Sequence, residues 1–167
     1  GKGVIVLDPS SRKSFRLDEV DRLSQQDLAQ FYEMRAAIES ETAALAARRR
    51  SSKDLKRLRD CLARMAQAVE DRTDGTGPDL EFHRIIAEVS GNRYLKDLMA
   101  YLNAKAGMVI RTARNHSSRD AKLPAVVQKE HEDIFEALSA GEENSARAST
   151  LRHLKNAAFR LGLKALG

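Results

Sequence analysis

The sequence contains no tryptophan, one cysteine and three prolines among its 167 residues, and no long apolar run. The single cysteine, Cys61, excludes an internal disulfide, and we expect the chain in a reducing compartment, the cytoplasm. No apolar run approaches the ~18 residues of a membrane span, and no signal-peptide pattern occurs. Aromatic residues make up 5% of the chain, so aliphatic residues must form the core, with Cys61 as a small member of it.

Neither sign of charge dominates the sequence. The net charge is +5, from 29 basic and 24 acidic residues, and the basic residues are dispersed. The densest run, Arg48-Arg49-Arg50, falls at a predicted helix end, where it can complement the helix dipole. This interpretation is favoured over a phosphate-binding patch. Length and composition, with 42% hydrophobic and 32% charged residues, indicate one folded domain.

The first part of the chain differs from the rest. Residues 1–7 combine a Gly-x-Gly turn with β-branched residues and predict the second strand of a hairpin. Residues 8–24 are polar, contain a proline and predict a linker, within which 17–23 could form a short helix. We expect the folded domain to occupy residues 25–167.

Helical periodicity begins at Ser24-x-x-Asp27, a capping box that predicts a helix over residues 25–49. Five further helices follow, each marked by a residue that commonly begins or ends a helix. These residues are Ser52, Pro78, Gly91, Asn92, Pro124 and Gly141. The polar stretch 115–122 predicts a loop. The expected fold is therefore all-α, an antiparallel helical bundle of six helices, or seven if 17–23 is helical.

Three of the four histidines fall on the inward faces of predicted helices. His83 lies one turn after Asp79, so an imidazole and a carboxylate share one helix face. His131 and His153 lie on the apolar faces of the last two helices. Burying several imidazoles is costly without partners, and a shared metal ion supplies one. We therefore predict a divalent transition metal held by these four residues, with zinc first and nickel or iron as alternatives.

Three arginine residues are candidates for contacting a ligand. Arg35 flanks the apolar face of the first helix, where it must extend its charged end to the surface, pair with an acid such as Glu39, or meet an anion. The sequence favours neither pairing with an acid nor binding of a ligand over the other. Arg111 and Arg114, near the end of the fourth helix, are weaker candidates for contacting a ligand.

The motifs, taken in order, resemble the FCD ligand-binding domain of GntR-family transcription regulators of the FadR subfamily. The resemblance extends from about Asp27 to Phe159. It rests on these segments: Arg35-x-x-x-Glu39, Asp79-x-x-Phe82-His83, Ser90-Gly91-Asn92, Glu130-His131-x-x-Ile134 and His153-Leu154.

The resemblance implies a homodimeric domain that binds a metal at Asp79, His83, His131 and His153. It also implies a small organic acid beside the metal, with Arg35 facing that pocket. Residues 1–7 are similar to the last strand of a winged-helix wing. We therefore expect a fragment of a longer regulator, which binds operator DNA through a winged-helix domain absent from this chain.

A metal-dependent hydrolase is the alternative function, since histidines, a carboxylate and open positions also describe a hydrolytic site. Glu81 and Glu130 adjoin predicted ligands, but neighbours in a helix point in different directions, so neither predicts a general base. A di-iron centre would need paired Glu-x-x-His motifs, which the sequence lacks. The sequence therefore favours a regulator without catalytic residues.

Overall fold

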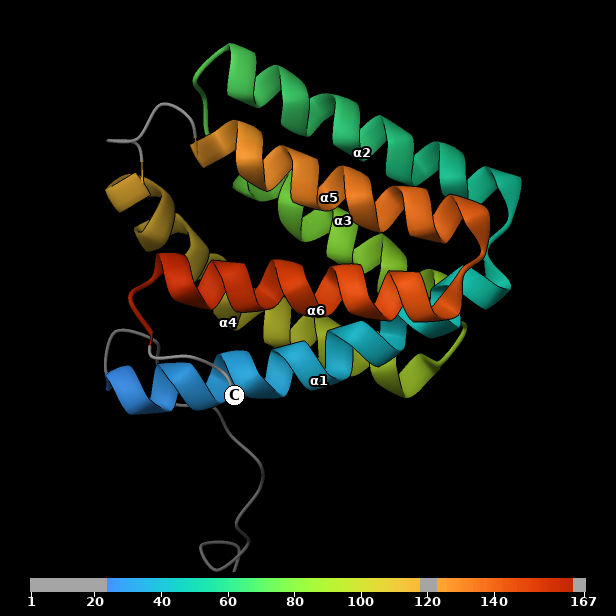
Figure 1. The fold of residues 1–167 in the computed structure, drawn as a ribbon, viewed down its shortest axis with the longest axis horizontal. Coiled ribbons are helices and arrows are strands. Elements are labelled where there is room, and N and C mark those ends of the chain that lie inside the picture. The colour runs from blue at the N-terminus through green and yellow to red at the C-terminus, as the bar shows by residue number, and fades with distance from the viewer. Residues whose placement is uncertain (1–23, 118–122, 164–167) are drawn as a thin grey trace, which may run out of the picture.

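The computed structural model describes residues 24–117 and 123–163, apart from the side chains of residue 106 and residues 108–117. Six α-helices make up this part of the chain, as predicted (Figure 1). They are α1 (Gln25–Arg49), α2 (Ser52–Glu70), α3 (Thr76–Val89), α4 (Arg93–Ser117), α5 (Leu123–Ala140) and α6 (Glu143–Arg160). The predicted wing strand, most of the linker and the short helix at 17–23 lie outside the described residues.

The helices form an antiparallel bundle, which confirms the predicted fold class. α1 and α6 run side by side in opposite directions and form the most extensive helix pair, and α5 packs against α6 (Figure 1). α2 packs on α3 and α5, while α3 also contacts α1 and α4. α3 is therefore covered on several sides, which accounts for its large share of buried residues.

Capping boxes fix the beginnings of α1 and α2. Ser24 Oγ accepts from the Asp27 backbone N–H, and the Asp27 carboxylate accepts from the backbone N–H of Ser24. This confirms the predicted start of α1. α2 is capped by Ser51 rather than by Ser52, because Asp54 stands three residues after Ser51 and closes the box there.

Two predicted helix ends are confirmed and one is wrong. Gly91 and Gly141 follow α3 and α5 with φ of 65° and 75°, the left-handed region that glycine adopts without strain. α4 continues to Ser117, into the stretch predicted as a loop. Residues 115–117 are polar but include no proline or glycine, so nothing in them breaks the helix.

Two arginines at the end of α1 donate hydrogen bonds to other helices. The guanidinium of Arg49 donates to the carbonyl of Ser90, at the end of α3. Arg50 donates to the carbonyl of Ser139, near the end of α5, at 3.2 Å. Both carbonyls belong to helix termini that lack partners within their own helix. The end of α1 thus joins α3 and α5 to the bundle.

The core comprises two apolar clusters with polar residues between them. One cluster includes Ala46, Cys61 and Phe82, and the other includes Tyr32 and Met99. Cys61 is fully buried, as predicted, and burial raises the pKa of its thiol. No helix of the described residues is long and apolar enough to cross a membrane.

Several polar and charged side chains are buried in the described part of the chain. They include Arg35, Glu39, Asp79, His83, Glu130, His131, Thr150 and His153. Since burying such groups without partners costs free energy, their positions identify the candidate site.

Candidate metal centre

The first two predicted ligands come from α3. Asp79 lies in its first turn and His83 one turn later, and the two residues are only 5% and 4% exposed. The spacing of four residues places both side chains on one face of the helix, as predicted. Because α3 is covered by its neighbours, that face points into the bundle.

The remaining histidines approach from two other helices. His131 of α5 is completely buried, and His153 of α6 is 5% exposed. One ring nitrogen from each of His83, His131 and His153 lies within 4.8 Å of the others. Asp79 Oδ1 lies 3.0 Å from Nε2 of His131. The structure therefore brings the three predicted histidines together from three helices, with Asp79 beside His131.

Each of the three imidazoles has an oxygen atom within 2.9 Å of its Nδ1. His131 Nδ1 lies 2.9 Å from the carbonyl oxygen of Val127, which can only accept, so Nδ1 carries the proton. His153 Nδ1 lies 2.8 Å from Oε2 of Glu130. An imidazole held in this way presents the lone pair of Nε2 to a metal.

Glu130 is the site residue that the sequence analysis missed. Its carboxylate is buried and also accepts from Asn156 at 2.8 Å and from Arg160 at 2.8 and 2.9 Å. Neighbours in a helix differ by about 100° in direction, and the buried face of α5 is wide enough to include both Glu130 and His131. The position of Glu130 one turn before Ile134 was the available signal.

Glu39 connects the third imidazole to the predicted arginine. Its Oε2 lies 2.9 Å from Nδ1 of His83, and its Oε1 accepts from Nε of Arg35 at 2.7 Å. Burial raises the pKa of Glu39, but the charges of Arg35 and His83 outweigh this effect and lower it to about 2. The carboxylate is therefore ionised and shared between the arginine and the histidine.

The pKa values of His153 and His83 are shifted in opposite directions. Burial, and then the neighbouring His131, lower the pKa of His153 to about 4. Burial acts in the same direction on His83, but the Glu39 carboxylate outweighs it and raises the pKa of that imidazole. A neutral His153 has a nitrogen lone pair available for a metal.

The donor set fits a divalent transition metal. Nε2 of His131 is buried and forms no aligned hydrogen bond within the described residues. Since its Nδ1 carries the proton, Nε2 directs a lone pair toward a carboxylate oxygen of Asp79 only 3.0 Å away. Two acceptors at this distance repel unless a cation lies between them or the imidazole takes a second proton. Three imidazoles and one carboxylate are ligands that zinc, nickel and iron accept.

Arg35 is 2% exposed, and its guanidinium carbon lies 5.2 Å from the centre of the Tyr32 ring. Of the two predicted roles, pairing with Glu39 is present in the structure. The pair also places Arg35 next to the histidine cluster, through Glu39. Arg111 and Arg114 belong to α4, but their side chains lie outside the described residues.

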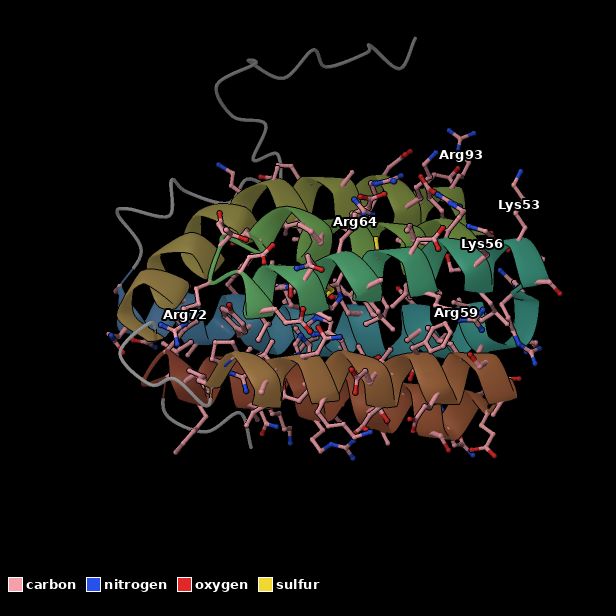
Figure 2. All side chains as sticks on the ribbon, turned by 90° about the horizontal axis from the view of Figure 1, so that it is seen from above. Lys53, Lys56, Arg59, Arg64, Arg72 and Arg93 are labelled. Carbon is pink, nitrogen blue, oxygen red and sulfur yellow. The ribbon has the colours of Figure 1, made fainter. Side chains whose placement is uncertain are left out.

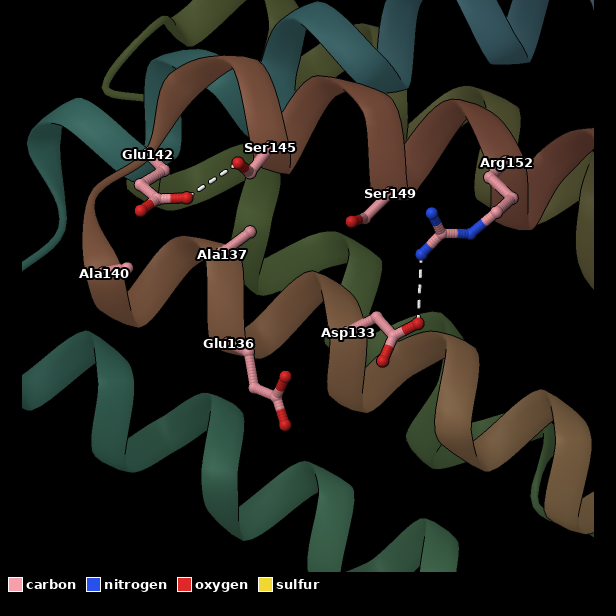
Figure 3. A pocket seen from close by; sticks show the side chains of 8 residues that line it. All are labelled: Asp133, Glu136, Ala137, Ala140, Glu142, Ser145, Ser149 and Arg152. Carbon is pink, nitrogen blue, oxygen red and sulfur yellow. Dashed lines mark hydrogen bonds and ion pairs between the residues drawn. The ribbon is translucent and has the colours of Figure 1, made fainter.

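The structure contains a small internal cavity and a larger surface groove. Only the cavity is lined by one of the three histidines, His83. An internal cavity of about 10 Å³ is lined by Glu39, Thr42, His83, Ile86, Met99 and Thr150. A surface groove of about 360 Å³ between α5 and α6 is lined by acidic and small residues, with Arg152 paired to Asp133 at 3.0 Å (Figure 3). The groove includes none of the four predicted ligands, so its larger volume does not make it the candidate site.

Several basic surface residues pair with acids in the described part of the chain. In Figure 2, Lys53, Lys56, Arg59 and Arg93 are labelled at one end of the molecule, Arg64 near its middle and Arg72 toward the other end. Lys56 pairs with Asp60 at 2.7 Å, and Arg64 pairs with Glu81 at 2.9 Å. Acids thus neutralise two of these six cations, which weakens the attraction of this surface for a phosphate backbone.

Comparison with known sequences shows the family of the chain. A family model described as the FCD domain matches residues 30–156. The HTH-type transcriptional regulator LutR of Bacillus subtilis (strain 168) is 31% identical over 152 residues, covering 86% of this chain and 69% of LutR.

Solved structures show the same fold. GntR of Streptococcus agalactiae matches with a TM-score of 0.68 and 21% identity, over 86% of this chain. McbR/YncC of E. coli matches with a TM-score of 0.68 and 20% identity, over 84% of this chain. The chain spans 61% of the Streptococcus protein and 71% of the E. coli protein.

Proposed function

The chain belongs to the FCD domain family, and from this premise we propose that it is the effector-binding and dimerisation domain of a bacterial GntR-type transcription regulator. In this proposal the domain senses a small organic acid at a metal-containing pocket and thereby controls DNA binding. Two-fold operators would match the symmetry of a homodimer.

The observation that carries the proposal is the convergence of three buried imidazoles with the carboxylate of Asp79. His83, His131 and His153 would hold the metal together with Asp79. Zinc is the first candidate, with nickel or iron as alternatives. When bound, the metal supplies a positive charge that attracts a carboxylate in a site from which water is excluded.

Arg35 would provide the second positive charge for the acid. A guanidinium offers a planar fork that matches a carboxylate, and charge-assisted hydrogen bonds of this kind are strong. The hydrogen bond to Glu39 uses Nε, so an acid would approach the other side of the guanidinium. Arg111 and Arg114 on α4 remain proposed secondary contacts.

Effector binding would alter DNA binding by stabilising one arrangement of the bundle over another. The ligands belong to α3, α5 and α6, while Arg35 and Glu39 belong to α1. An acid that contacts both groups would change how α1 sits against the other helices. LutR is an HTH-type regulator by name, and a DNA-binding domain preceding α1 would respond to that change.

The hydrolase alternative finds no support in the relatives, whose names are those of transcription regulators. The chemistry also disfavours it. Glu130, the buried acid nearest the histidines in sequence, already accepts hydrogen bonds from His153, Asn156 and Arg160. A carboxylate engaged in this way is poorly placed to take a proton from a metal-bound water.

A thermal-shift screen against short carboxylic acids tests the proposed function. We expect at least one acid to raise the melting temperature of zinc-loaded protein, because a ligand that binds only the folded state stabilises it. The gain should disappear with a chelator. Stabilisation that is the same with and without chelator would contradict a metal-containing pocket.

A further inference from the structure

The last turn of α6 presents an aromatic side chain to solvent. Phe159 is 80% exposed, although the preceding residue, Ala158, is buried in the core. Large hydrophobic side chains that are at least half exposed are few in the described part of the chain, and the others are Tyr94 and Val126. Phe159 and Val126 therefore need an account of what they contact.

Phe159 and Val126 lie at the same end of the bundle. Glu130 of α5 accepts hydrogen bonds from Asn156 and Arg160 of α6, which fixes how the two antiparallel helices are aligned. Val126 stands one turn before Glu130, so it lies level with the last turn of α6. In Figure 1 the beginning of α5 and the end of α6 are at one end of the molecule. We call Val126 and Phe159 the end patch.

The chain enters the bundle beside the end patch. The first turns of α1 pack against the end of α6, where Leu28 and Phe31 share an apolar cluster with Leu161. α1 begins at a capping box whose first residue, Ser24, has an extended backbone with ψ of 164°. The helix axis therefore does not continue into residues 17–23, which lie outside the described residues.

The sequence of residues 17–23 is amphipathic at helical spacing. Leu17, Val20 and Leu23 recur every three residues, and the four remaining positions are charged. In a helix the three apolar residues share one face, whereas a strand would place Leu17 and Leu23 on a face with two acids. Leu23 also immediately precedes the N-cap of α1, and Leu28 is the fourth helical residue. An apolar pair at these two positions commonly packs together and fixes the angle at which the chain enters a helix.

We propose that residues 17–23 form a short helix that docks on the end patch of the same chain, with its apolar face over the patch and Leu23 against Leu28. The size of the patch decides between this occupant and a separate protein. A stable interface between two proteins buries about 800 Å² on each partner, far more than two side chains provide. A segment tethered beside the patch has a high effective concentration there, so a small apolar contact is enough to hold it.

Docking at this position would attach the chain that precedes residue 17 to α6 as well as to α1. The attached turn of α6 includes Arg160, which hydrogen-bonds Glu130, and Glu130 in turn lies 2.8 Å from Nδ1 of His153. A DNA-binding domain ahead of this segment would thus be joined to the helix that carries a proposed metal ligand. This role as a connection rests on the proposed function, whereas the docking itself requires neither metal nor acid.

Hydrogen exchange measured by mass spectrometry on the 167-residue chain tests the docking. In wild type the amides of residues 17–23 should exchange at least about tenfold more slowly than those of an unfolded peptide. Phe159→Ser and Val20→Ser should each remove this protection, the effect of losing one buried apolar side chain. Phe159→Leu should keep most of it. Tyr94→Ser is the matched control, because it removes an aromatic side chain that is 73% exposed on α4, and it should leave the protection unchanged.

A short bismaleimide added to the Val20→Cys/Lys155→Cys variant identifies which chain supplies the segment. Lys155 stands one turn before Phe159, and Cys61 can stay in place because it is buried. A cross-link within one chain supports the proposal, and a cross-link between two chains would overturn docking on the same chain. Unprotected amides at residues 17–23 in wild type, or protection that survives in a folded Phe159→Ser variant, would overturn it as well. Neither result depends on metal or acid binding, so failure here is distinguishable from failure of the proposed function.

Discussion

The carboxylate of Glu130 accepts two hydrogen bonds from the guanidinium of Arg160, at 2.8 and 2.9 Å, while its Oε2 also lies 2.8 Å from Nδ1 of His153. These contacts connect a predicted metal ligand to the last turn of α6. Burial raises the pKa of Glu130, but His153 and Arg160 outweigh this and lower it to about 2, so the carboxylate is ionised. Glu130 thereby holds the imidazole in one orientation.

Removing this support should weaken metal binding. We expect Glu130→Ala to lower zinc affinity about 10- to 100-fold, the usual effect of losing a group that orients a ligand. Glu130→Gln should recover part of the loss, since an amide oxygen still accepts from Nδ1. Chelator competition measures both values. Glu136→Ala, at a side chain 71% exposed on the same helix, is the control and should bind zinc like wild type.

Purified protein should contain close to one divalent transition ion per chain. His131→Ala should lose the ion, and its melting temperature should fall because metal-binding energy is also folding energy. Elemental analysis and calorimetry check the two effects. His116→Ala is the matched control, because His116 is the one histidine outside the proposed ligand set. The prediction would be refuted if wild-type protein contained no metal and still had an intact, equally stable bundle.

The helices and the inward-facing histidines were predictable because both are marked by residues that lie close together in the sequence. Capping boxes and glycines mark helix ends locally, and inward histidines follow the 3.6-residue period. The contacts of Arg49 and Arg50 with α3 and α5 were not predictable, because they join residues at least 41 positions apart. The role of Glu130 was missed because the width of a buried helix face depends on how many neighbours cover it.

Arg35 should contribute to acid binding separately from the metal. Arg35→Ala should keep the ion but weaken binding of the best acid by about 1.5–3 kcal/mol, the scale of a hydrogen bond to a charged group. Arg35→Lys should recover only part of this loss, since a point charge cannot pair bidentately. Isothermal titration of the zinc-loaded proteins provides the measurement.

Because Arg35 is paired with Glu39, a further variant is needed to separate a loss of acid binding from a loss of stability. Arg35→Ala leaves a buried carboxylate without its main partner, which costs about 3–5 kcal/mol of stability. The double substitution Arg35→Met with Glu39→Gln removes both charges and avoids that cost. If all of these proteins bind the acid equally, Arg35 pairs with Glu39 and does not contact the ligand.

The three consecutive arginines at the end of α1 should differ in their effect on stability. Arg49→Ala and Arg50→Ala should each lower the free energy of unfolding by about 1 kcal/mol, through loss of hydrogen bonds to helix-terminal carbonyls. Arg48→Ala should change it by less than about 0.5 kcal/mol, because exposed ion pairs contribute little. Arg48 is 54% exposed and lies 3.8 Å from Glu143. Urea denaturation of the three variants gives the comparison.

The 167-residue chain should form a dimer and bind no operator specifically. All six helices of the described residues pack within the bundle, and several of their surface cations pair with acids, which weakens attraction to phosphates. Light scattering after size exclusion would report the dimer. A gel-shift assay at ~150 mM salt, where nonspecific phosphate binding is weak, should show no sequence-specific retardation, and such retardation would contradict the prediction.

The small cavity beside His83 has a consequence for how fast the domain can respond. Every residue that lines it is at most 4% exposed, so the acid proposed as the effector could not reach His83 from this side by diffusion alone. The helices would have to separate first, and the observed association rate would then level off at the rate of that opening as ligand concentration rises. Release waits for the same motion, which lengthens the lifetime of the complex. A regulator built on this domain would respond to sustained changes in metabolite level and ignore brief ones.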